Sequence, residues 1–514
     1  MHYYNHFLEV AMRGIHSLVN ENRRRVFTEV ARMAYAGNGY AGAEDIPYII
    51  VPGDVSHTRD SVFLERAIVG EGVRLAMGLS LRPAHTRVLM TEGMDHAAIA
   101  EQYYEPPLIN IIPYACHCCP PNQYRVTEGC QNCLAGSCQR VCPKGAISVI
   151  NGRSYIDQSK CIKCGKCAKA CDYNAIIHLE RPCQKACGMD AIGIDEHGRA
   201  VINQDKCVSC GQCLVSCPFG AIADKSQIFQ IITSILQGDR VIAIVAPAFI
   251  GQFSKRATPD KFITGLQMLG FDRMVEVAIG ADMCTIEEAR DFLEHVPEKQ
   301  NYMATSCCPA WHSMIEKNFP SEVSKMSMTL TPMVFTARML KKEDPNCKIV
   351  FVGPCAAKKL EAIRADIRSD VDFVLTFEEL QGMFEAKGIN LDEVESSEPF
   401  NEGTAAGRGF AVSGGVAKAV TDLIAETNPD LEVKTARAEG LRECKKMMQL
   451  AKAGKYNGYL LEGMACPGGC VAGAGTMLSV ESAQKLVAAY MKEAKTASPL
   501  ESPYHNMGKE LEEE

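Results

Sequence analysis

The sequence predicts an α/β domain preceded by two small cysteine-rich α+β modules and a mainly helical N-terminal domain. Apolar residues recur at helical spacing near the N-terminus. Seventeen of the 25 cysteines lie between Cys116 and Cys217. Farther along, short apolar strands run directly into loops of Gly, Pro or Cys, with helical stretches between them. The predicted regions are residues 1–110, 111–225 and 238–490, followed by an acidic tail over 491–514.

Composition and charge exclude several classes of protein. The chain has 514 residues, of which 47% are apolar, and so has room for about three domains. It carries 62 acidic against 54 basic side chains, a net charge of −8, which makes nucleic acid an unfavourable partner. The N-terminus lacks the pattern of a signal peptide, and no run of about 18 apolar residues would cross a membrane. We therefore expect a cytoplasmic protein.

The N-terminal domain carries no chemical motif. Helical periodicity occurs in HFLEVAMRGIHSLV, residues 6–19, and in SVFLERAIVGEGVRLAMGL, residues 61–79. Between them, IPYIIVPG, residues 46–53, is typical of a strand. We expect a domain that docks on or covers the remainder of the chain.

The cysteine-rich region contains an internal repeat. The sequences that follow four of its cysteines are similar: CPKGAISV at 142, CDYNAIIHL at 171, CGMDAIGI at 187 and CPFGAIAD at 217. Four half-units imply two pseudo-symmetric pairs. SVINGRSYID, residues 148–157, predicts a hairpin with an Asn-Gly turn, and GIDEHGRAVIN, residues 193–203, predicts a second hairpin. Units this small bury little apolar surface, so bound clusters must contribute to their folding.

Metal is a better explanation than disulfides for this density of cysteine, because cytosolic thiols are kept reduced. A [4Fe-4S] cluster takes four thiolates, and in two-cluster ferredoxins the run C-x2-C-x2-C-x3-C gives its last cysteine to the other cluster. The first pair contains one such run and a second with a two-residue insertion. Exchanging the last ligands gives two quartets: Cys130, Cys133, Cys138 and Cys171, and Cys161, Cys164, Cys167 and Cys142.

In the second pair only one run is complete. Cys187 takes the crossover place and completes a quartet with the first three cysteines of that run, Cys207, Cys210 and Cys213. Cys217 and Cys183 then lack two ligands, which the nearby Cys116 and Cys119 can supply. The alternatives are an empty half-site or a different choice among Cys116, His117, Cys118 and Cys119. A row of clusters typically carries electrons between the surface and a buried site.

The α/β region places further cysteines at the ends of predicted strands. The strands VIAIVAPAF, KIVFVGPC and GYLLEGMAC alternate with helices such as TIEEARDFLEHV and SAQKLVAAYMKEA. Loops at strand ends are where open α/β folds build their sites. Cysteines occur there in TSCCPAW (Cys307, Cys308), GPCAAKK (Cys355) and EGMACPGGC (Cys466, Cys470). Four of them on three loops can meet at one cluster. Isolated cysteines such as Cys284, Cys347 and Cys444 are typical of buried thiols, and the final GKELEEE is typical of a solvated end.

These three motifs, in this order, resemble those of the iron-only, or [FeFe], hydrogenases, and the resemblance covers roughly residues 112–490. It implies a two-lobed α/β catalytic domain preceded by ferredoxin-like dicluster modules. It also implies an H-cluster, a [4Fe-4S] cubane joined through a cysteine thiolate to a two-iron unit with CO, CN− and an azadithiolate bridge. Carried over by position, Cys308, Cys355, Cys466 and Cys470 hold the cubane, and Cys470 bridges to the two-iron unit.

The resemblance also implies roles for residues that are not ligands. Cys307 is the thiol that exchanges a proton with the bridging amine, and a relay runs from it through Glu288 and Ser327 towards Asp291. Lys358 hydrogen-bonds a cyanide ligand. Other positions match the lining of the cofactor pocket: Ala246, Pro247, Gly353, Phe410 and Met464.

The chain departs from the best-known members at several positions. It has Gly353 in place of a methionine, Ala310 in place of a glycine and Met333 where a glutamine is frequent, and Asp291 replaces a glutamate. These changes indicate a divergent branch that resembles the second clostridial group (group B). The alternatives for the relay residues are a solvated helix face for Glu288 and Asp291, and a helix cap for Ser327.

The leading hypothesis for the function is reversible formation of H2 from protons and electrons, with ferredoxin as electron partner and with diiron maturation proteins supplying the cofactor. One alternative is an H2 sensor, although the sensory members of the family generally carry a signalling domain or lose the relay cysteine. Another is a non-catalytic iron-sulfur assembly protein. Cys307, Lys358 and Met464 count against the assembly protein, since a bare cubane needs none of them.

Overall fold

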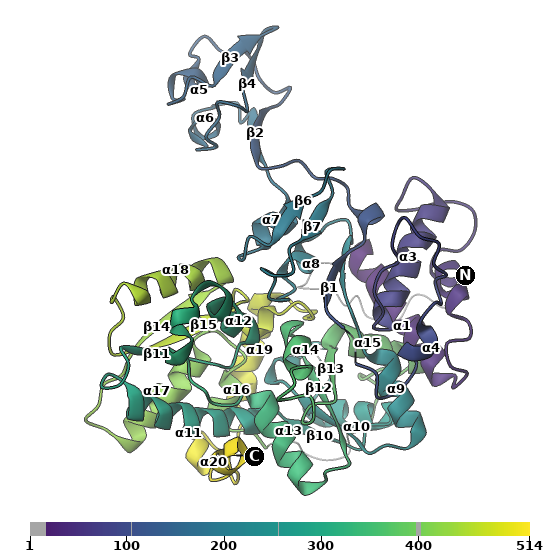
Figure 1. Cartoon of the computed structure of the whole chain (residues 1–514), viewed down its shortest axis with the longest axis vertical. Helices are drawn as coiled ribbons and strands as arrows, with labels where there is room; N and C mark the ends of the chain where they lie inside the picture. Colours follow the sequence, from purple (N-terminus) through teal and green to yellow (C-terminus); the bar gives the residue numbers. More distant parts are fainter. Residues whose placement is uncertain (1–16, 104, 255, 397–401, 514) are drawn as a thin grey trace.

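The computed structural model describes residues 17–103, 105–254, 256–396 and 402–513. The N-terminal helices lie on one side of the molecule, the α/β region forms its body, and part of the cysteine-rich region extends away from both (Figure 1). Within the described ranges, no helix is both long and apolar enough to cross a membrane.

The N-terminal region forms helices α1 (Leu18–Tyr35), α2 (Ile46–Ile50), α3 (Val62–Ala76) and α4 (Met94–Ala97). Helix α3 confirms the helix predicted over residues 61–79, whereas most of the helix predicted over 6–19 lies outside the described residues. The strand predicted over 46–53 is wrong, because this segment forms α2. Pro47 sits in the first helical turn, where no backbone N–H is needed, and Ile46 and Ile50 are buried in the same core as α1 and α3.

The cysteine-rich region consists of two modules, one inserted in the other. The outer module contains β2 (Gln123–Val126), α5 (Ser137–Arg140), β3 (Ile147–Ile150), β4 (Arg153–Ile156), α6 (Lys166–Lys169) and β5 (Ile176–Leu179). The inner module contains β1 (Ile109–Ile111), α7 (Pro182–Ala186), β6 (Ile192–Ile194), β7 (Ala200–Ile202), α8 (Gln212–Ser216) and β8 (Ile222–Asp224). Strand β1 pairs antiparallel with β8, and β2 with β5. The outer module is therefore inserted between β1 and α7.

Both predicted hairpins are confirmed. Strands β3 and β4 pair antiparallel across Asn151 and Gly152, which have positive φ angles of 51° and 74°. Strands β6 and β7 also pair antiparallel, through a longer turn. In that turn the Asp195 carboxylate accepts hydrogen bonds from the backbone N–H groups of His197 and Arg199, at 3.0 and 2.8 Å.

The α/β region contains two parallel sheets. One has the order β10 (Arg273–Glu276), β9 (Val241–Val245), β12 (Lys348–Gly353) and β13 (Phe373–Thr376). The other has the order β11 (Tyr302–Ala304), β15 (Tyr459–Met464) and β14 (Lys434–Glu439). Every residue of β9 is buried, as expected for a parallel strand covered by helices on both faces.

Helices surround these sheets. They are α9 (Ile228–Gln237), α10 (Pro259–Leu269), α11 (Ala278–His295), α12 (Pro309–Asn318), α13 (Pro332–Glu343), α14 (Ala357–Ala362), α15 (Phe377–Lys387), α16 (Ala405–Gly409), α17 (Gly415–Thr427), α18 (Leu441–Lys452), α19 (Val480–Lys492) and α20 (Gly508–Glu513).

The expectation of a solvated acidic end is wrong. Residues Gly508–Glu513 form α20, which packs against α11 and α13 (Figure 1). Leu511 is fully buried in the apolar core between these helices, and its carbonyl oxygen accepts a hydrogen bond from Arg338 at 2.7 Å. One apolar side chain in an acidic run is therefore enough to dock the segment.

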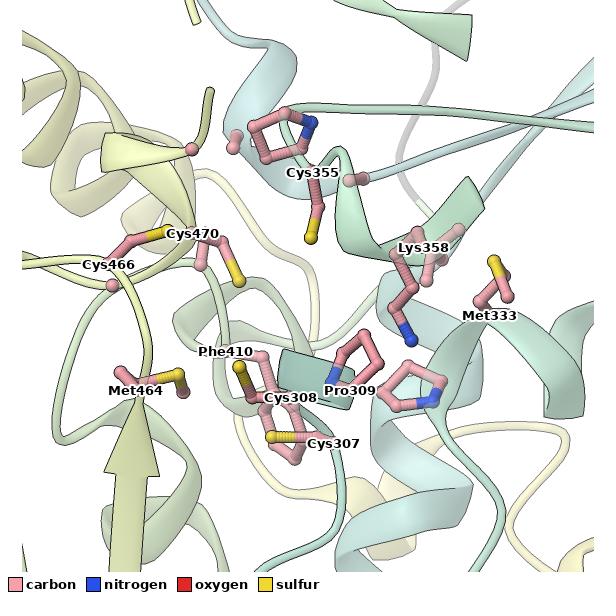
Figure 2. Close-up of a pocket in the computed structure, with 18 of the residues that line it drawn as sticks. Cys307, Cys308, Pro309, Met333, Cys355, Lys358, Phe410, Met464, Cys466 and Cys470 are labelled. Carbon is pink, nitrogen blue, oxygen red and sulfur yellow. The ribbon is translucent and has the colours of Figure 1, made fainter. Parts of the chain in front are cut away.

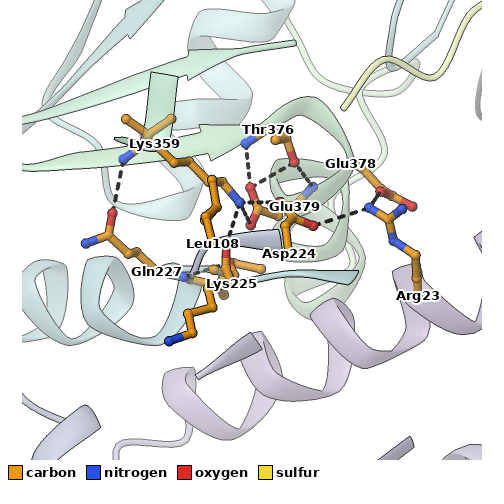
Figure 3. A network of polar contacts seen from close by, with 12 residues as sticks. Arg23, Leu108, Asp224, Lys225, Gln227, Lys359, Thr376, Glu378 and Glu379 are labelled. Carbon is orange, nitrogen blue, oxygen red and sulfur yellow. Dashed lines mark hydrogen bonds and ion pairs between the residues drawn. The ribbon is translucent and has the colours of Figure 1, made fainter. Parts of the chain in front are cut away.

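A buried network of charges joins the three regions (Figure 3). The Lys359 Nζ on α14 lies 2.8 Å from Asp224 at the end of β8 and 2.7 Å from Glu379 on α15. Arg23 on α1 pairs with Glu378 at 2.5 Å and lies 3.7 Å from Asp224. The network therefore links the N-terminal helix and the inner module to the α/β region, close to the strand that carries Cys355.

Replacing Lys359 by methionine should destabilise this junction strongly. The change leaves Asp224 and Glu379 buried without their shared cation, which typically costs about 3–5 kcal/mol. Lys485→Met is the control, because Lys485 is 75% exposed and pairs only with Glu481 on its own helix. Anaerobic thermal unfolding measures the effect. Equal transition temperatures for the two variants would contradict the role given to Lys359.

Candidate functional site

An apolar cavity of about 90 Å³ lies between the two sheets of the α/β region. Five of the six cysteines that line it come from three loops of this region, and their side chains surround a common space (Figure 2). Cys307 and Cys308 follow β11, Cys355 follows β12, and Cys466 and Cys470 follow β15. Parallel strands bring these loops together at their carboxyl ends.

The close approach of the loops depends on small residues. A Cβ at Gly473 would lie 2.2 Å from the carbonyl oxygen of Pro354, so the loop after β15 can reach the loop that carries Cys355 only because residue 473 has no side chain. Gly463 on β15 similarly lies against the ring of Trp311, where a Cβ would lie 2.3 Å from the ring. The buried Trp311 lies in the first turn of α12, the helix that Cys308 caps.

Most of the other residues predicted for this site also line the cavity: Ala246, Pro247, Ala310, Met333, Lys358, Phe410 and Met464. Gly353 does not belong to the lining. The ring of Phe351 lies against it, 2.5 Å from the position that a Cβ at residue 353 would take. Phe351 lines the cavity instead, and the sequence pattern did not single it out.

The electrostatics of the sulfur atoms suit a cationic cluster. Burial, together with repulsion by neighbouring thiolates, raises the pKa of Cys355 to about 11 and that of Cys470 to about 12. Positive charge among the sulfurs is therefore needed to keep them deprotonated at neutral pH. Donors already point at the ligand positions: Gln212 Nε2 lies 3.1 Å from the Cys466 sulfur, and backbone N–H groups of Ala465 and Trp311 bond to Cys308.

Smaller cavities in the two modules gather the predicted cysteine quartets. One is lined by Cys130, Cys133, Cys138 and Cys171, one by Cys116, Cys119, Cys183 and Cys217, and one by Cys187, Cys207, Cys210 and Cys213. Cys142, Cys161 and Cys167 share one small core in the outer module, with the exposed Cys164 on the same loop. Backbone N–H groups lie 3.3–3.4 Å from the sulfurs of Cys116, Cys142, Cys161, Cys171, Cys187 and Cys207, as iron-bound thiolates require.

The alternatives for the fourth quartet differ in geometry. Cys118 is exposed with a positive φ of 48°, and its sulfur lies 3.6 Å from the carbonyl oxygen of His197. His117 borders the cavity, but its ring stacks on Phe219 with ring centres 4.3 Å apart. Cys116 and Cys119 both face the cavity with Cys183 and Cys217.

One quartet of the inner module reaches the main cavity. Cys210 lines both its own cavity and the one between the sheets. The next residue, Gly211, has a φ of 75°, and a Cβ there would lie 2.4 Å from the Cβ of Ala474. Any other residue at position 211 would therefore push the two cysteine sites apart.

The predicted relay residues are only partly connected. Glu288 is fully buried, so the alternative of a solvated face is excluded for it, and burial raises its pKa to about 7. Its Oε1 accepts hydrogen bonds from the N–H and the hydroxyl of Ser306, at 3.0 and 3.3 Å. Its Oε2 has no partner among the described residues. Ser306 was not predicted, although it immediately precedes Cys307.

The outer half of the relay is a separate group. Ser327 donates to Asp291 at 3.1 Å, and Asp291 lies 3.1 Å from the ring of His295. Ser327 is not a helix cap, because Thr331 holds that position for α13. No hydrogen bond joins Glu288 to Ser327 within the described ranges. Helix α20 adds Glu512 near Glu287 and Asp291, and burial raises the pKa of Glu512 to about 7.

Lys358 extends from α14 into the cavity (Figure 2). Its Nζ donates to the Thr331 hydroxyl at 3.0 Å and pairs with Glu361 at 2.7 Å. Burial lowers its pKa, but Glu361 and the neighbouring thiols more than offset this and leave the pKa raised. The side chain is therefore a fixed cation at one end of an otherwise apolar cavity.

Comparisons with known proteins agree with this geometry. Residues 239–474 match the family described as iron only hydrogenase large subunit, C-terminal domain. Residues 154–177 match a 4Fe-4S binding domain, and residues 177–228 match the LdpA Fe-S cluster-binding domain. Iron hydrogenase 1 of Clostridium pasteurianum is 30% identical over 386 residues, 65% of this chain and 67% of that protein. The chain belongs to the iron-only hydrogenase family.

Relatives within this family differ in function. The periplasmic [Fe] hydrogenase large subunit of Nitratidesulfovibrio vulgaris is 28% identical over 287 residues, 46% of this chain and 68% of that protein. A probable cytosolic Fe-S cluster assembly factor of Aedes aegypti is also 28% identical, over 256 residues, 40% of this chain and 54% of that protein. Membership therefore establishes the catalytic-domain fold and iron-sulfur binding.

The raised pKa of Glu288 predicts a pH-dependent stability. The folded protein keeps the proton up to about pH 7, whereas the unfolded chain loses it near the ordinary glutamate pKa of 4.5. The contribution of Glu288 to the free energy of unfolding is fully present below pH 4.5. It is lost as the pH rises through 7, and the loss is about 3 kcal/mol at most. Glu288→Gln removes the titration, so the variant should gain stability relative to the wild type between pH 5 and pH 8.

Anaerobic thermal unfolding at the two pH values measures this difference. Glu294→Gln is the control, because Glu294 is exposed and its hydrogen bond with Lys299 lowers its pKa, opposite in direction to the shift at Glu288. If the difference in unfolding temperature between the wild type and Glu288→Gln does not change with pH, the result would contradict a neutral, buried Glu288.

Proposed function

We propose that the protein is an [FeFe]-hydrogenase that catalyses the reversible reaction of two protons and two electrons to H2. The observation that carries the proposal is Cys307, a thiol in the cavity that belongs neither to the four ligands a cubane needs nor to the neighbouring quartet that contains Cys210. Cys308, Cys355, Cys466 and Cys470 are the proposed ligands, with Cys470 bridging to a two-iron unit. Such an H-cluster supplies the iron at which H2 forms or is split.

In this proposal the chain's own residues hold and move the proton. Cys307 lies inside the apolar cavity and delivers the proton to the reacting centre. Glu288, whose pKa is raised by burial to about 7, can take and release it at physiological pH. A water bonded to the free Oε2 of Glu288 is the link that we propose to Ser327, and Asp291 then carries the proton outward.

Lys358 and the apolar lining have separate roles. The Lys358 ammonium is positioned to donate a hydrogen bond to an anionic diatomic ligand at its end of the cavity. Ala246, Pro247, Phe410 and Met464 exclude bulk water, which strengthens every polar contact inside. We infer that diiron maturation proteins insert the two-iron unit.

Electrons reach the site through the accessory clusters. We propose four [4Fe-4S] clusters on the predicted quartets, ending at the quartet that contains Cys210. Gln212, which donates to the Cys466 sulfur, connects this quartet to the cubane ligands. Ferredoxin is the proposed electron partner.

The second candidate function is an iron-sulfur assembly factor, as the similarity to the probable assembly factor of Aedes aegypti suggests. Beyond its four ligands, a cubane alone would need neither a thiol in the cavity at 307 nor a fixed cation at 358. The same residues favour the hydrogenase over a sensor that lacks the relay thiol.

Cys307→Ala should abolish nearly all H2 turnover in a fully matured protein while the iron content is unchanged. An alanine side chain cannot transfer a proton. The iron content should not change, because Cys307 is not one of the proposed cluster ligands. Cys284→Ala is the matched control, because Cys284 is a buried thiol that also lies near Glu288 and, like Cys307, has a raised pKa. H2 evolution with dithionite-reduced methyl viologen measures both. Turnover by Cys307→Ala equal to that of Cys284→Ala would refute the relay role.

The cluster count has its own test. The reconstituted protein should hold about sixteen accessory irons, and Cys116→Ser combined with Cys119→Ser should remove about four of them. Cys118→Ser should remove none, because its exposed sulfur faces a backbone carbonyl group. Iron analysis and the spectra of the reduced clusters measure this. An iron content that falls in Cys118→Ser, or is unchanged in the double variant, would contradict the fourth quartet.

A further inference from the structure

The outer module differs in charge from the rest of the chain. Residues 123–179 contain eight Lys and Arg against three Asp and Glu, a formal charge of +5 before clusters are bound. Because the whole chain is at −8, the remainder carries −13. The negative charge of bound clusters would lie behind these side chains, in the interior of the module.

The same module is the part of the molecule that extends farthest from the body (Figure 1). Its strands pair only with one another, β2 with β5 and β3 with β4, and its small core contains only residues of the module. A partner can therefore approach it without meeting the acidic surface of the α/β region.

The positive charge is concentrated around one cluster loop. We define the lysine face as Ile162, Lys163, Lys166 and Lys169, which are all exposed. Its three lysines form no ion pair with any residue that the structure describes, whereas Arg153 pairs with Glu128 and Lys160 with Asp157 elsewhere in the module. Six basic side chains of the module form no ion pair among the described residues. Three of them lie together beside Cys161 and Cys164, and the other three are Arg125, Arg140 and Lys144.

The lysine face also brings a proposed cluster ligand to the surface. Cys164 is exposed, and Ile162, between Cys161 and Lys163, is 55% exposed. An apolar side chain next to a ligand sulfur, with lysines around it, suits a small and transient interface. Electron-transfer partners typically bury less than about 1,200 Å² and depend on charge for orientation and for association rate.

We propose that the lysine face is the docking surface for a small acidic one-electron carrier of the ferredoxin type. This rests on the proposed function and locates its electron entry point. One electron passes from the reduced cluster of the carrier, which is oxidised, to the cluster on Cys142, Cys161, Cys164 and Cys167, which is reduced. No atom or bond is transferred. Because the carrier is negatively charged, it is attracted to the outer module and repelled by the remainder of the chain.

A charge reversal tests the surface in the matured holoprotein. The test variant combines Lys163→Glu, Lys166→Glu and Lys169→Glu. The control combines Lys418→Glu, Lys434→Glu and Lys485→Glu, three exposed lysines of the α/β region, and changes the net charge equally. The probe is an oxidised bacterial 2[4Fe-4S] ferredoxin of net negative charge. Its binding is measured by biolayer interferometry between 20 and 300 mM NaCl, and iron content verifies the clusters.

The test variant should bind the ferredoxin at least tenfold more weakly than the control variant at low salt. The affinity of the wild type should fall as salt rises, and that of the test variant should change little. With methyl viologen, H2 turnover of both variants should stay within twofold of the wild type. Absence of methyl viologen turnover in all three proteins would count against the proposed function, whereas the binding measurement still reports on docking.

Two results would overturn the proposal. One is equal ferredoxin binding by the test and control variants. The other concerns self-association, measured by sedimentation at low salt. If the wild type binds no ferredoxin but self-associates, and the test variant stays monomeric, the lysine face binds the acidic body of a second copy instead.

Discussion

The structure depends on bringing sulfur atoms from two separate sheets into one apolar cavity. Cys355 extends from the sheet of β12, whereas Cys308, Cys466 and Cys470 extend from the sheet of β11 and β15. Buried thiolates repel one another, so this arrangement is unfavourable until positive charge lies among them. A bound cluster would therefore join the two lobes as well as serve the chemistry, and the fit of Gly473 against Pro354 and of Gly463 against Trp311 keeps the loops in reach.

The other regions position what must reach this cavity. Gly211 lets the inner module approach the ligand loops, and Gln212 hydrogen-bonds a ligand sulfur directly. The buried network of Lys359, Asp224, Glu379 and Arg23 holds the inner module in that position. Through Arg23, helix α1 therefore has a structural role, although the N-terminal region carries no chemical motif. The outer module, inserted into the inner one, extends the row of cysteine quartets away from the body.

Local patterns in the sequence predicted much of this arrangement, and the differences arise from long-range contacts. The strands before Cys355 and Cys466 and the crossover pairing of cysteines depend on spacing, which a sequence displays directly. The nested topology depends on β1 pairing with β8 across more than one hundred residues, which no local pattern shows. Residues 46–50 have the composition of a strand, but they form a helix that packs on α1 and α3.

The infrared spectrum of the anaerobically matured protein tests the central claim most directly. If the cavity holds a two-iron unit on the thiolate of Cys470, the spectrum contains bands of CO and CN− bound to iron. These bands should be absent from protein produced without the maturation proteins, although its cubane absorption should remain. A matured protein with a full complement of cubanes and no such bands would contradict the account and would favour an iron-sulfur protein without hydrogenase chemistry.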